Sequence, residues 1–214
     1  MNKWTDDYRR GDHVIQVYQT DTEREKALLE LVEWSRDDEK VVCLTDKLSL
    51  RPSDGHGSPL TTSLNPEIEK GRLEVRPSFS SYCPGGTFRG TGMFELWEKI
   101  HADAMEQGYK GLITVGDVSW LKTHKSVFHR FMRYEQGIDF ARFPKNITIL
   151  CQYDQRLFSS EELDRAVGVH QLQLSGGRLE RNYWFIMRRT TEHGYPLESL
   201  KKPSVISESF TKRL

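Results

Sequence analysis

The residues best suited to ligand chemistry follow the short apolar run 112–115. Gly116 and Asp117 end this run, and Trp120 comes three residues after the aspartate. A short run of branched residues without polar alternation is typical of a strand covered on both faces. Because open α/β sheets bind ligands beyond the carboxyl ends of their strands, we predict a binding site at these residues. A plain turn, with Asp117 as a cap and Trp120 in the core, explains the same residues equally well.

Four further candidates are expected near the same edge of the sheet. They are Tyr18, Thr45, Phe88 and Tyr153. Three of them end predicted strands, and the fourth lies in the loop 77–92, which is rich in glycine and aromatic residues. Small-molecule sites combine aromatic walls with a few polar groups that orient the ligand. The alternative for each residue is an ordinary role in packing or in a turn.

His13 opens the first predicted strand. An imidazole that changes charge at about pH 6.5 can contact a ligand or act as a hydrogen-bonding switch. The amino end of a strand lies away from the carboxyl-end crevice, which favours a structural role at the strand entrance. Both interpretations of His13 stay open at this point.

A metal site or a catalytic nucleophile would have to be formed by the histidines and the three cysteines. Cys43 and Cys151 lie in apolar runs, where free thiols are commonly packing residues. Together with His13 they would supply metal ligands, but the chain has no CxxC or HxxxH pair. His124 and His129 are five residues apart and do not share a helix face. We therefore predict no metal site, no catalytic residue and no enzymatic activity, and the sequence identifies no cofactor.

Composition limits the class of protein. The 214 residues carry 31 Lys and Arg against 31 Asp and Glu, so no net charge favours nucleic acid or an anionic membrane. No apolar run approaches the roughly 20 residues that a membrane-spanning helix needs. The first residues lack the apolar core of a signal peptide, and the cysteines are too widely spaced for a disulfide framework. We expect a cytoplasmic protein that binds neither nucleic acid nor membranes directly.

Strands and helices alternate along the chain and would position these candidates. Strands are predicted at 13–18, 41–45, 73–76, 111–116 and 147–153. Apolar residues at helical spacing follow residue 22 and recur at 91–107, 126–135 and 162–167. This alternation predicts the α/β class, with a mainly parallel sheet in a three-layer sandwich. Two late strands, 169–174 and 183–187, are expected to add an antiparallel edge near the C-terminus.

Local signals mark two helix starts and one long loop. Thr22 with Glu25, and Ser159 with Glu162, each match a capping box, in which two side chains satisfy amides of the first helical turn. The stretch 46–65 is rich in Gly, Pro, Ser and Thr and has no period. It predicts a surface loop that serves as a lid or an insertion.

Six stretches of the chain resemble a known family. They are GDHVIQVYQTDTEREKALL, KVVCLTD, EKGRLEV, YKGLITVGDVSWL, RYEQ and ILCQYDQRLFSSEEL. Between residues 10 and 184 they resemble the MEDS domain, the sensory domain of DcmR-like regulators and of many methylotroph and methanogen signalling proteins. The resemblance implies ligand sensing in prokaryotic signal transduction, proposed to involve simple hydrocarbon derivatives, with an output such as transcription regulation.

The layout is also similar to that of RecA- and KaiC-like ATPases, in which a phosphate-binding loop joins the first strand to a helix. Such a loop needs the pattern GxxxxGK followed by Ser or Thr, because its backbone amides wrap the phosphates. At this place the chain has QTDTERE, without glycine, and its acidic side chains would repel a polyphosphate. Asp117 corresponds to the metal-assisting aspartate of such ATPases but has no loop to work with. We therefore predict a RecA/KaiC-like fold with a degenerate phosphate loop.

Three regions follow from these signals: a lead-in at 1–12, a MEDS-like sensory domain at 13–187 and a basic tail at 188–214. The leading hypothesis is a non-enzymatic small-molecule sensor that acts on a signalling or transcription-regulator protein or through a homodimer. One alternative is a divergent KaiC-like nucleotide-binding protein or ATPase. Another is a structural adaptor or dimerisation module.

Overall fold

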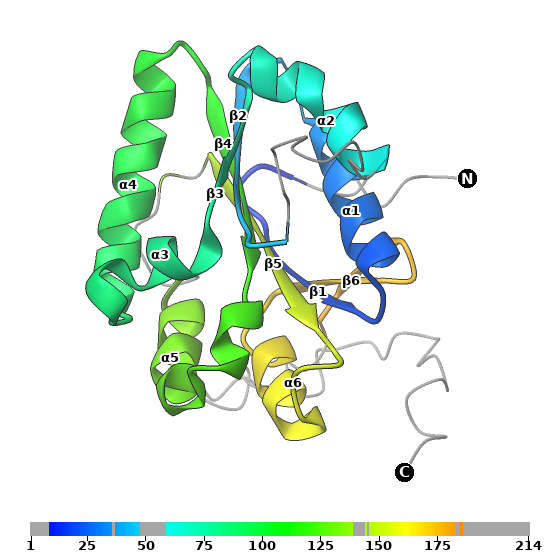
Figure 1. Ribbon diagram of the computed structural model, residues 1–214, viewed down its shortest axis with the longest axis vertical. Helices are drawn as coiled ribbons and strands as arrows, with labels where there is room; N and C mark the ends of the chain where they lie inside the picture. Colours follow the sequence, from blue (N-terminus) through cyan, green and yellow to red (C-terminus); the bar gives the residue numbers. More distant parts are fainter. Residues whose placement is uncertain are drawn as a thin grey trace, which may run out of the picture.

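The computed structural model describes residues 9–35, 37–47, 59–138, 144, 146–182 and 185. These residues build a seven-stranded sheet with the order β3-β2-β4-β5-β1-β6-β7 (Figure 1). The strands are β1 (His13–Tyr18), β2 (Glu39–Leu44), β3 (Leu73–Arg76), β4 (Gly111–Asp117), β5 (Ile147–Asp154), β6 (Leu172–Ser175) and β7 (Arg178–Arg181). Among these strands, β7 runs antiparallel to β6 and every other neighbouring pair is parallel. The predicted mainly parallel α/β sheet is confirmed.

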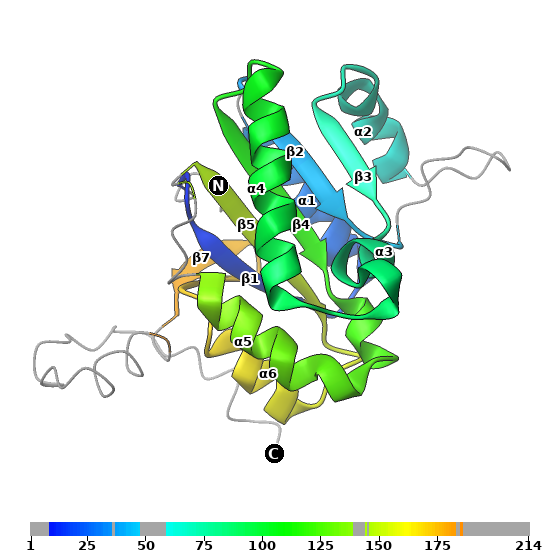
Figure 2. The same ribbon diagram turned by 90° about the vertical axis from the view of Figure 1, so that its left-hand side faces the viewer.

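Helices cover both faces of this sheet, which makes the predicted three layers. They are α1 (Asp21–Trp34), α2 (Pro59–Glu69), α3 (Ser78–Tyr82), α4 (Gly90–Glu106), α5 (Phe128–Ile138) and α6 (Ser160–Val167), with the short 3-10 turns η2 (Pro84–Gly86), η3 (Ser119–Lys122) and η4 (Lys125–Val127). α1 and α2 lie on one face of the sheet, and α4, α5 and α6 lie on the other (Figures 1 and 2).

The alternation along β5 explains why each face has its own apolar core. Cys151 joins a cluster with Trp97 of α4 and Phe131 of α5, whereas Leu150 joins a second cluster with Leu28 of α1. Successive side chains of a strand point to opposite faces, so a strand between two helical layers is apolar without interruption. All eight residues of β5 are buried, and the predicted strand 147–153 covers seven of them.

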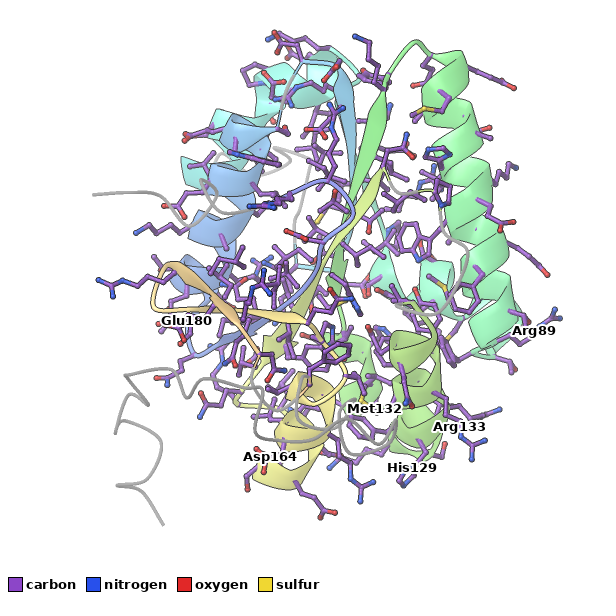
Figure 3. All side chains as sticks on the ribbon, turned by 180° about the vertical axis from the view of Figure 1, so that it is seen from behind. Arg89, His129, Met132, Arg133, Asp164 and Glu180 are labelled. Carbon is purple, nitrogen blue, oxygen red and sulfur yellow. The ribbon has the colours of Figure 1, made fainter. Side chains whose placement is uncertain are left out.

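The sequence of α5 shows a helix with one buried and one outer face. Phe131 and Met132 are buried among the core residues. His129 and Arg133 are exposed and lie on the outer side of the helix (Figure 3). Glu135 follows four residues after Phe131, which places its carboxylate on the buried face, where a charge requires partners.

The predicted antiparallel edge near the C-terminus is confirmed, but its strands have other bounds than the predicted 169–174 and 183–187. β6 pairs with β1 in parallel, because α6 carries the chain back along the sheet before β6 begins. Gly176 and Gly177, with φ angles of 54° and 74°, then form a tight turn directly into β7. The antiparallel pair is therefore β6 with β7, and most of 183–187 lies outside the described residues.

One predicted capping box is confirmed and the other is shifted. Ser159 caps α6, accepting from the backbone nitrogen of Glu162 at 3.2 Å. At α1 the box is formed by Thr20 and Glu23 in place of the predicted Thr22 and Glu25. β1 ends at Tyr18 as predicted, but a turn of only two residues then brings the chain into α1 at Asp21, earlier than a cap at Thr22 allows.

Two predicted loops contain helical structure. In the stretch 46–65, α2 begins at Pro59, while 48–58 lies outside the described residues. In the loop 77–92, α3 and η2 precede α4, and the Asp46 carboxylate accepts hydrogen bonds from the backbone nitrogens of Ser78 at 3.0 Å and Phe79 at 3.2 Å. These contacts join the end of β2 to the start of α3.

The predicted lead-in and tail lie mostly or wholly outside the described residues, so the domain boundaries stay predictions. Over the residues whose structure is described, every helix is too short or too polar to cross a membrane.

Candidate functional site

Polar side chains gather at two places on opposite faces of the sheet. The carboxyl-end cluster consists of Tyr18, Thr45, Lys47, Asp117 and Asp154, and Arg24 of α1 is buried on the same face of the sheet. The buried histidine cluster consists of His13, Glu135, Cys151 and His170. Alternation along the strands turns the first cluster toward α1 and the second toward α5 and α6.

Lys47 joins the ends of three strands in the carboxyl-end cluster. Its ammonium donates to the hydroxyl of Tyr18 at 2.6 Å and to Oδ2 of Asp154 at 2.9 Å. The same ammonium lies 3.9 Å from Oδ2 of Asp117, which also accepts a hydrogen bond from Thr45 at 3.2 Å. Three of the predicted site residues, Tyr18, Thr45 and Asp117, are thus brought together around one cation.

Arg156 holds the Asp154 carboxylate in this cluster. Its Nε and Nη2 atoms donate to the carboxylate at 2.8 Å and 2.7 Å, and Nη2 also donates to Asp21 of α1 at 2.9 Å. Burial alone would raise the pKa of Asp154, but Arg156 and Lys47 lower it well below its ordinary value. The ionised carboxylate therefore fixes the position of Lys47.

Arg24 of α1 is buried in the same layer, with only 2% of the residue exposed. Its Nη2 atom donates to Glu25 at 3.2 Å, but Nε and Nη1 have no hydrogen-bond partner among the described residues. Arg24 is near enough to Cys43 of β2 to act on it electrostatically, as Asp117 does. A buried cation with unpaired donors is costly, so it requires an explanation such as a bound acceptor.

Asp117 makes the turn contact expected of a cap and also lies in the carboxyl-end cluster. Its Oδ1 atom accepts from the backbone nitrogen of Ser119 at 2.9 Å, which forms the turn after β4. Its Oδ2 atom faces Thr45 and Lys47 in the carboxyl-end cluster. The capping interaction and the position in the cluster are therefore compatible.

Phe88, Gly116 and Trp120 lie away from this cluster, on the face that packs against α4 and α5. The Trp120 ring stacks on Tyr82 with 5.4 Å between centroids and lies 5.9 Å from the ring of Phe88. The Tyr82 hydroxyl packs directly against Gly116. The structure thus divides the predicted site residues between the two faces of the sheet.

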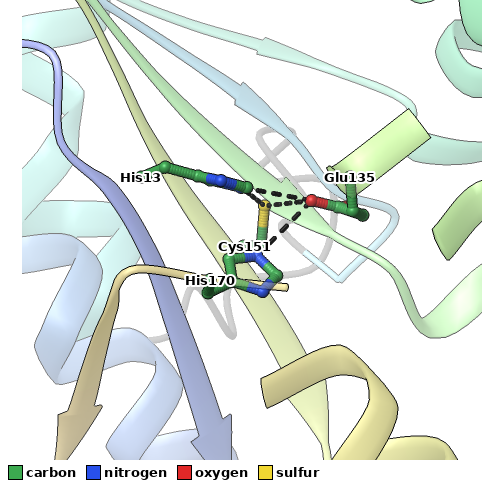
Figure 4. A group of neighbouring side chains, drawn as sticks. All are labelled: His13, Glu135, Cys151 and His170. Atoms are coloured by element: carbon green, nitrogen blue, oxygen red, sulfur yellow. Dashed lines mark hydrogen bonds and ion pairs between the residues drawn. The ribbon is translucent and has the colours of Figure 1, made fainter. Parts of the chain in front are cut away.

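The buried histidine cluster brings side chains from distant parts of the chain to one point (Figure 4). Oε2 of Glu135 lies 3.2 Å from Nε2 of His13, 3.4 Å from Nε2 of His170 and 3.5 Å from Sγ of Cys151. The Sγ atom of Cys151 lies 3.7 Å from Nε2 of His13. Each of the four residues is at most 2% exposed.

Strand register and one backbone contact explain how these side chains meet. His13 of β1 aligns with Ile149 of β5, two residues before Cys151, so both side chains point to the same face. His170 follows α6, and its Nδ1 atom lies 2.7 Å from the carbonyl oxygen of Ala166. That carbonyl can only accept, so Nδ1 carries the proton and Nε2 faces the cluster.

The ionisable groups of this cluster are buried. Burial alone would raise the pKa of Glu135, but the two imidazoles beside it lower the pKa to about 2. Burial and the neighbouring His13 lower the pKa of His170. The buried Tyr153 hydroxyl has no hydrogen-bond partner within the described residues, and its ring lies 6.1 Å from that of His170. Tyr153 thus lies beside this cluster and not among the carboxyl-end residues.

Sequence reasoning did not single out Arg24, Lys47, Glu135 or His170. The sequence does contain a signal for Glu135. This acidic residue occupies a position that helical periodicity assigns to the apolar face of α5. The metal ligands considered from the sequence were His13, Cys43 and Cys151. In the structure His13 and Cys151 lie side by side, but Cys43 belongs to the core on the opposite face of the sheet.

The family model described as MEDS, the methanogen/methylotroph DcmR sensory domain, matches residues 12–171. This span contains every residue of both clusters. No curated protein matches the chain.

Proposed function

We propose that this chain, which belongs to the MEDS family of sensory domains, detects a small molecule at the carboxyl-end cluster and does so without catalysis. The family supplies the sensory role. The observation that carries the choice of site is the buried guanidinium of Arg24, two of whose nitrogens have no partner among the described residues. The ligand, the partner and the absence of catalysis are our inferences.

The unpaired donors of Arg24 favour a ligand with a hydrogen-bond acceptor, such as an oxygenated hydrocarbon derivative. Binding would replace the lost hydration of the guanidinium with ligand contacts, which is favourable because a buried charge without partners is costly. Tyr18, Thr45 and Asp117 would orient the polar group of the ligand. Small-molecule sites are built in this way, from a few placed polar groups on a rigid scaffold.

Lys47 offers a route from the ligand to the surface of the protein. Its side chain is 27% exposed, and its ammonium bonds buried groups on the strand ends. A ligand that competes for Asp117 or Tyr18 changes the position of this ammonium and so the surface near it. Such a change signals only if the partner, a regulator protein or a second copy of this chain, binds the two states with different affinity.

The start of α1 argues against a polyphosphate ligand beside the carboxyl-end cluster. Asp21 and Glu23 occupy the first turn of the helix, and Thr20 and Glu23 satisfy the amides there. Phosphate-binding helix starts leave these amides free and surround them with glycine. Calorimetric titration with ATP and magnesium tests the nucleotide alternative, which a sub-millimolar dissociation constant would favour.

The proposal is tested by native mass spectrometry of the full chain purified from its own host. We expect the wild-type protein to carry a small molecule, and the Arg24→Met variant, which keeps the length of the side chain, to lose it. Lys26→Met is the matched control, because Lys26 lies on the same helix with 69% of its side chain exposed. Wild-type protein without a small molecule, or Arg24→Met protein that retains it, contradicts the proposal.

A further inference from the structure

We propose that His13, Glu135, Cys151 and His170 form a tetrahedral binding site for a divalent transition-metal ion of the Zn²⁺ type. This inference goes beyond the proposed ligand site, since it uses other residues on the opposite face of the sheet. It also departs from the expectation of no metal site, which rested on ligand spacing along the chain.

Four of the six separations within the cluster are close to those of a metal coordination shell. With bonds of about 2.0–2.3 Å from metal to nitrogen, oxygen or sulfur, the corners of a tetrahedron lie about 3.3–3.8 Å apart. Four of the separations between the ligand atoms are 3.2, 3.4, 3.5 and 3.7 Å. All four atoms lie within 4.8 Å of one another, and each belongs to a different residue. The geometry therefore fits one ion at the centre.

The donor types select the class of metal. Two imidazole nitrogens, one sulfur and one carboxylate oxygen suit Zn²⁺ and its neighbours in the first transition row. Ca²⁺ and Mg²⁺ prefer six or more oxygen ligands, which this cluster does not offer. Four protein ligands with full burial leave no open position, as in metal sites that stabilise a structure and unlike those that activate water.

The orientation of His170 is the independent observation that points to a bound ion. Because Nδ1 donates to the carbonyl oxygen of Ala166, the neutral ring presents the lone pair of Nε2 to the cluster. This Nε2 atom has no hydrogen bond to any residue that the structure describes, although it lies 3.4 Å from the carboxylate of Glu135. A lone pair facing a carboxylate is unfavourable, so either a proton or a metal ion must lie between Nε2 and Glu135. Metal-binding histidines typically donate their second nitrogen to a carbonyl in this way.

The remaining polar atoms of the cluster agree with this assignment. Oε1 of Glu135 is buried and has no hydrogen-bond partner within the described ranges. A carboxylate that coordinates a cation through one oxygen can leave the other oxygen without a hydrogen bond. In an isolated buried carboxylate, an oxygen without a hydrogen bond costs much more free energy. Binding requires the Cys151 thiol to release its proton to solvent, so the site binds metal as the thiolate.

The site would join elements that are far apart in the chain. Its ligands come from β1, β5, α5 and the segment after α6, and His13 is 122 residues from Glu135. Because such a site does not exist in the unfolded chain, metal binding stabilises the folded state. We therefore expect removal of the metal to lower the melting temperature of the domain.

The test uses the full chain, stripped with a chelator and titrated first with Zn²⁺ and then, separately, with Co²⁺. We expect one equivalent of either ion, a higher melting temperature, and a thiolate-to-cobalt charge-transfer band in the near ultraviolet. Cys151→Ser should lose the band. It should also weaken Zn²⁺ binding by more than roughly 10–100-fold, the loss typical when a residue that only hydrogen-bonds a metal ligand is replaced. Cys43→Ser is the matched control, because it removes a buried free cysteine from the core on the other face.

The outcomes separate this proposal from the small-molecule site. Arg24→Met should bind Zn²⁺ as the wild type does, so failure of either proposal leaves the other standing. Absence of a stoichiometric ion in folded wild-type protein overturns the metal site, as does a charge-transfer band that survives in Cys151→Ser or disappears in Cys43→Ser. If Cys151→Ser does not fold, the wild-type spectrum compared with Cys43→Ser decides the question.

Discussion

The hydroxyl of Tyr82 lies so close to Gly116 that a Cβ atom on this glycine would stand 2.2 Å from the oxygen. Both residues are part of the packed face between β4 and α3. The sequence suggested that Gly116 serves a ligand crevice, but the close approach of a buried phenol explains why the residue has no side chain.

Gly116→Ala is therefore expected to destabilise the protein by about 1–3 kcal/mol, the range for overpacking a core. Adding Tyr82→Phe should recover part of this loss, because it removes the oxygen and leaves the ring carbon 3.5 Å away. Urea unfolding of the four proteins in the double-mutant cycle measures the coupling. Gly92→Ala is the control, since its nearest atom lies 3.8 Å away. Purely additive effects of Gly116→Ala and Tyr82→Phe would contradict the steric explanation.

A hydrogen bond in the same core leads to the second prediction. The indole nitrogen of Trp97 donates to the hydroxyl of Tyr134 at 2.7 Å, and both residues are buried. Tyr134→Phe leaves this donor without an acceptor, so we expect a loss of about 1–3 kcal/mol in the free energy of unfolding. Tyr109→Phe should change it far less, because that hydroxyl makes a longer contact of 3.4 Å to Gly71 at the surface. Equal losses in the two variants would refute the argument.

The sheet could be predicted because its central strands lie between two helical layers. Strands such as β4 and β5 are apolar on both faces, and that pattern marks their ends to within a residue or two. β7 was missed because Arg178–Arg181 is a charged edge strand that packs little of its surface. Charged edges of this kind discourage pairing with other chains, and they also remove the alternation by which strands are recognised.

The candidate sites were harder to predict because they depend on contacts between distant residues. Tyr18, Thr45 and Asp117 were selected by a rule that concerns strand ends alone, and their role as site residues stays a prediction. His170 and Glu135 follow no such rule, since they meet His13 only after three elements have packed. Lys47 lies just beyond a strand end, and its role depends on the Tyr18 and Asp154 groups that face it.

The shifted capping box at α1 gives the third prediction. Thr20 accepts a hydrogen bond from the backbone nitrogen of Glu23, so Thr20→Ala should cost about 1 kcal/mol of stability. Thr22 lies within the first turn, and Thr22→Ala should be close to neutral because the cap remains. Chemical denaturation of the two single variants measures the difference. A larger loss for Thr22→Ala would restore the assignment made from the sequence.

The fourth prediction concerns acid stability and depends on Asp154. Arg156 and Lys47 hold the pKa of this carboxyl well below its ordinary value of 3.8. In the unfolded chain the group takes up a proton near that ordinary value, whereas in the folded protein it stays ionised to lower pH. The stabilising contribution is therefore complete above about pH 5 and is lost as the pH falls through the unfolded and then the folded pKa.

We expect the difference in unfolding free energy between wild type and Asp154→Asn to be largest near neutral pH and to shrink below about pH 4. The other charged groups around Asp154, namely Lys47, Arg156, Asp117 and Asp21, are present in both proteins and largely cancel in this difference. Asp164→Asn serves as the surface control, because Asp164 is exposed on the outer side of α6 (Figure 3). A difference that stays constant from pH 7 to pH 3 would mean that Asp154 acts through packing, and not through the charge that positions Lys47.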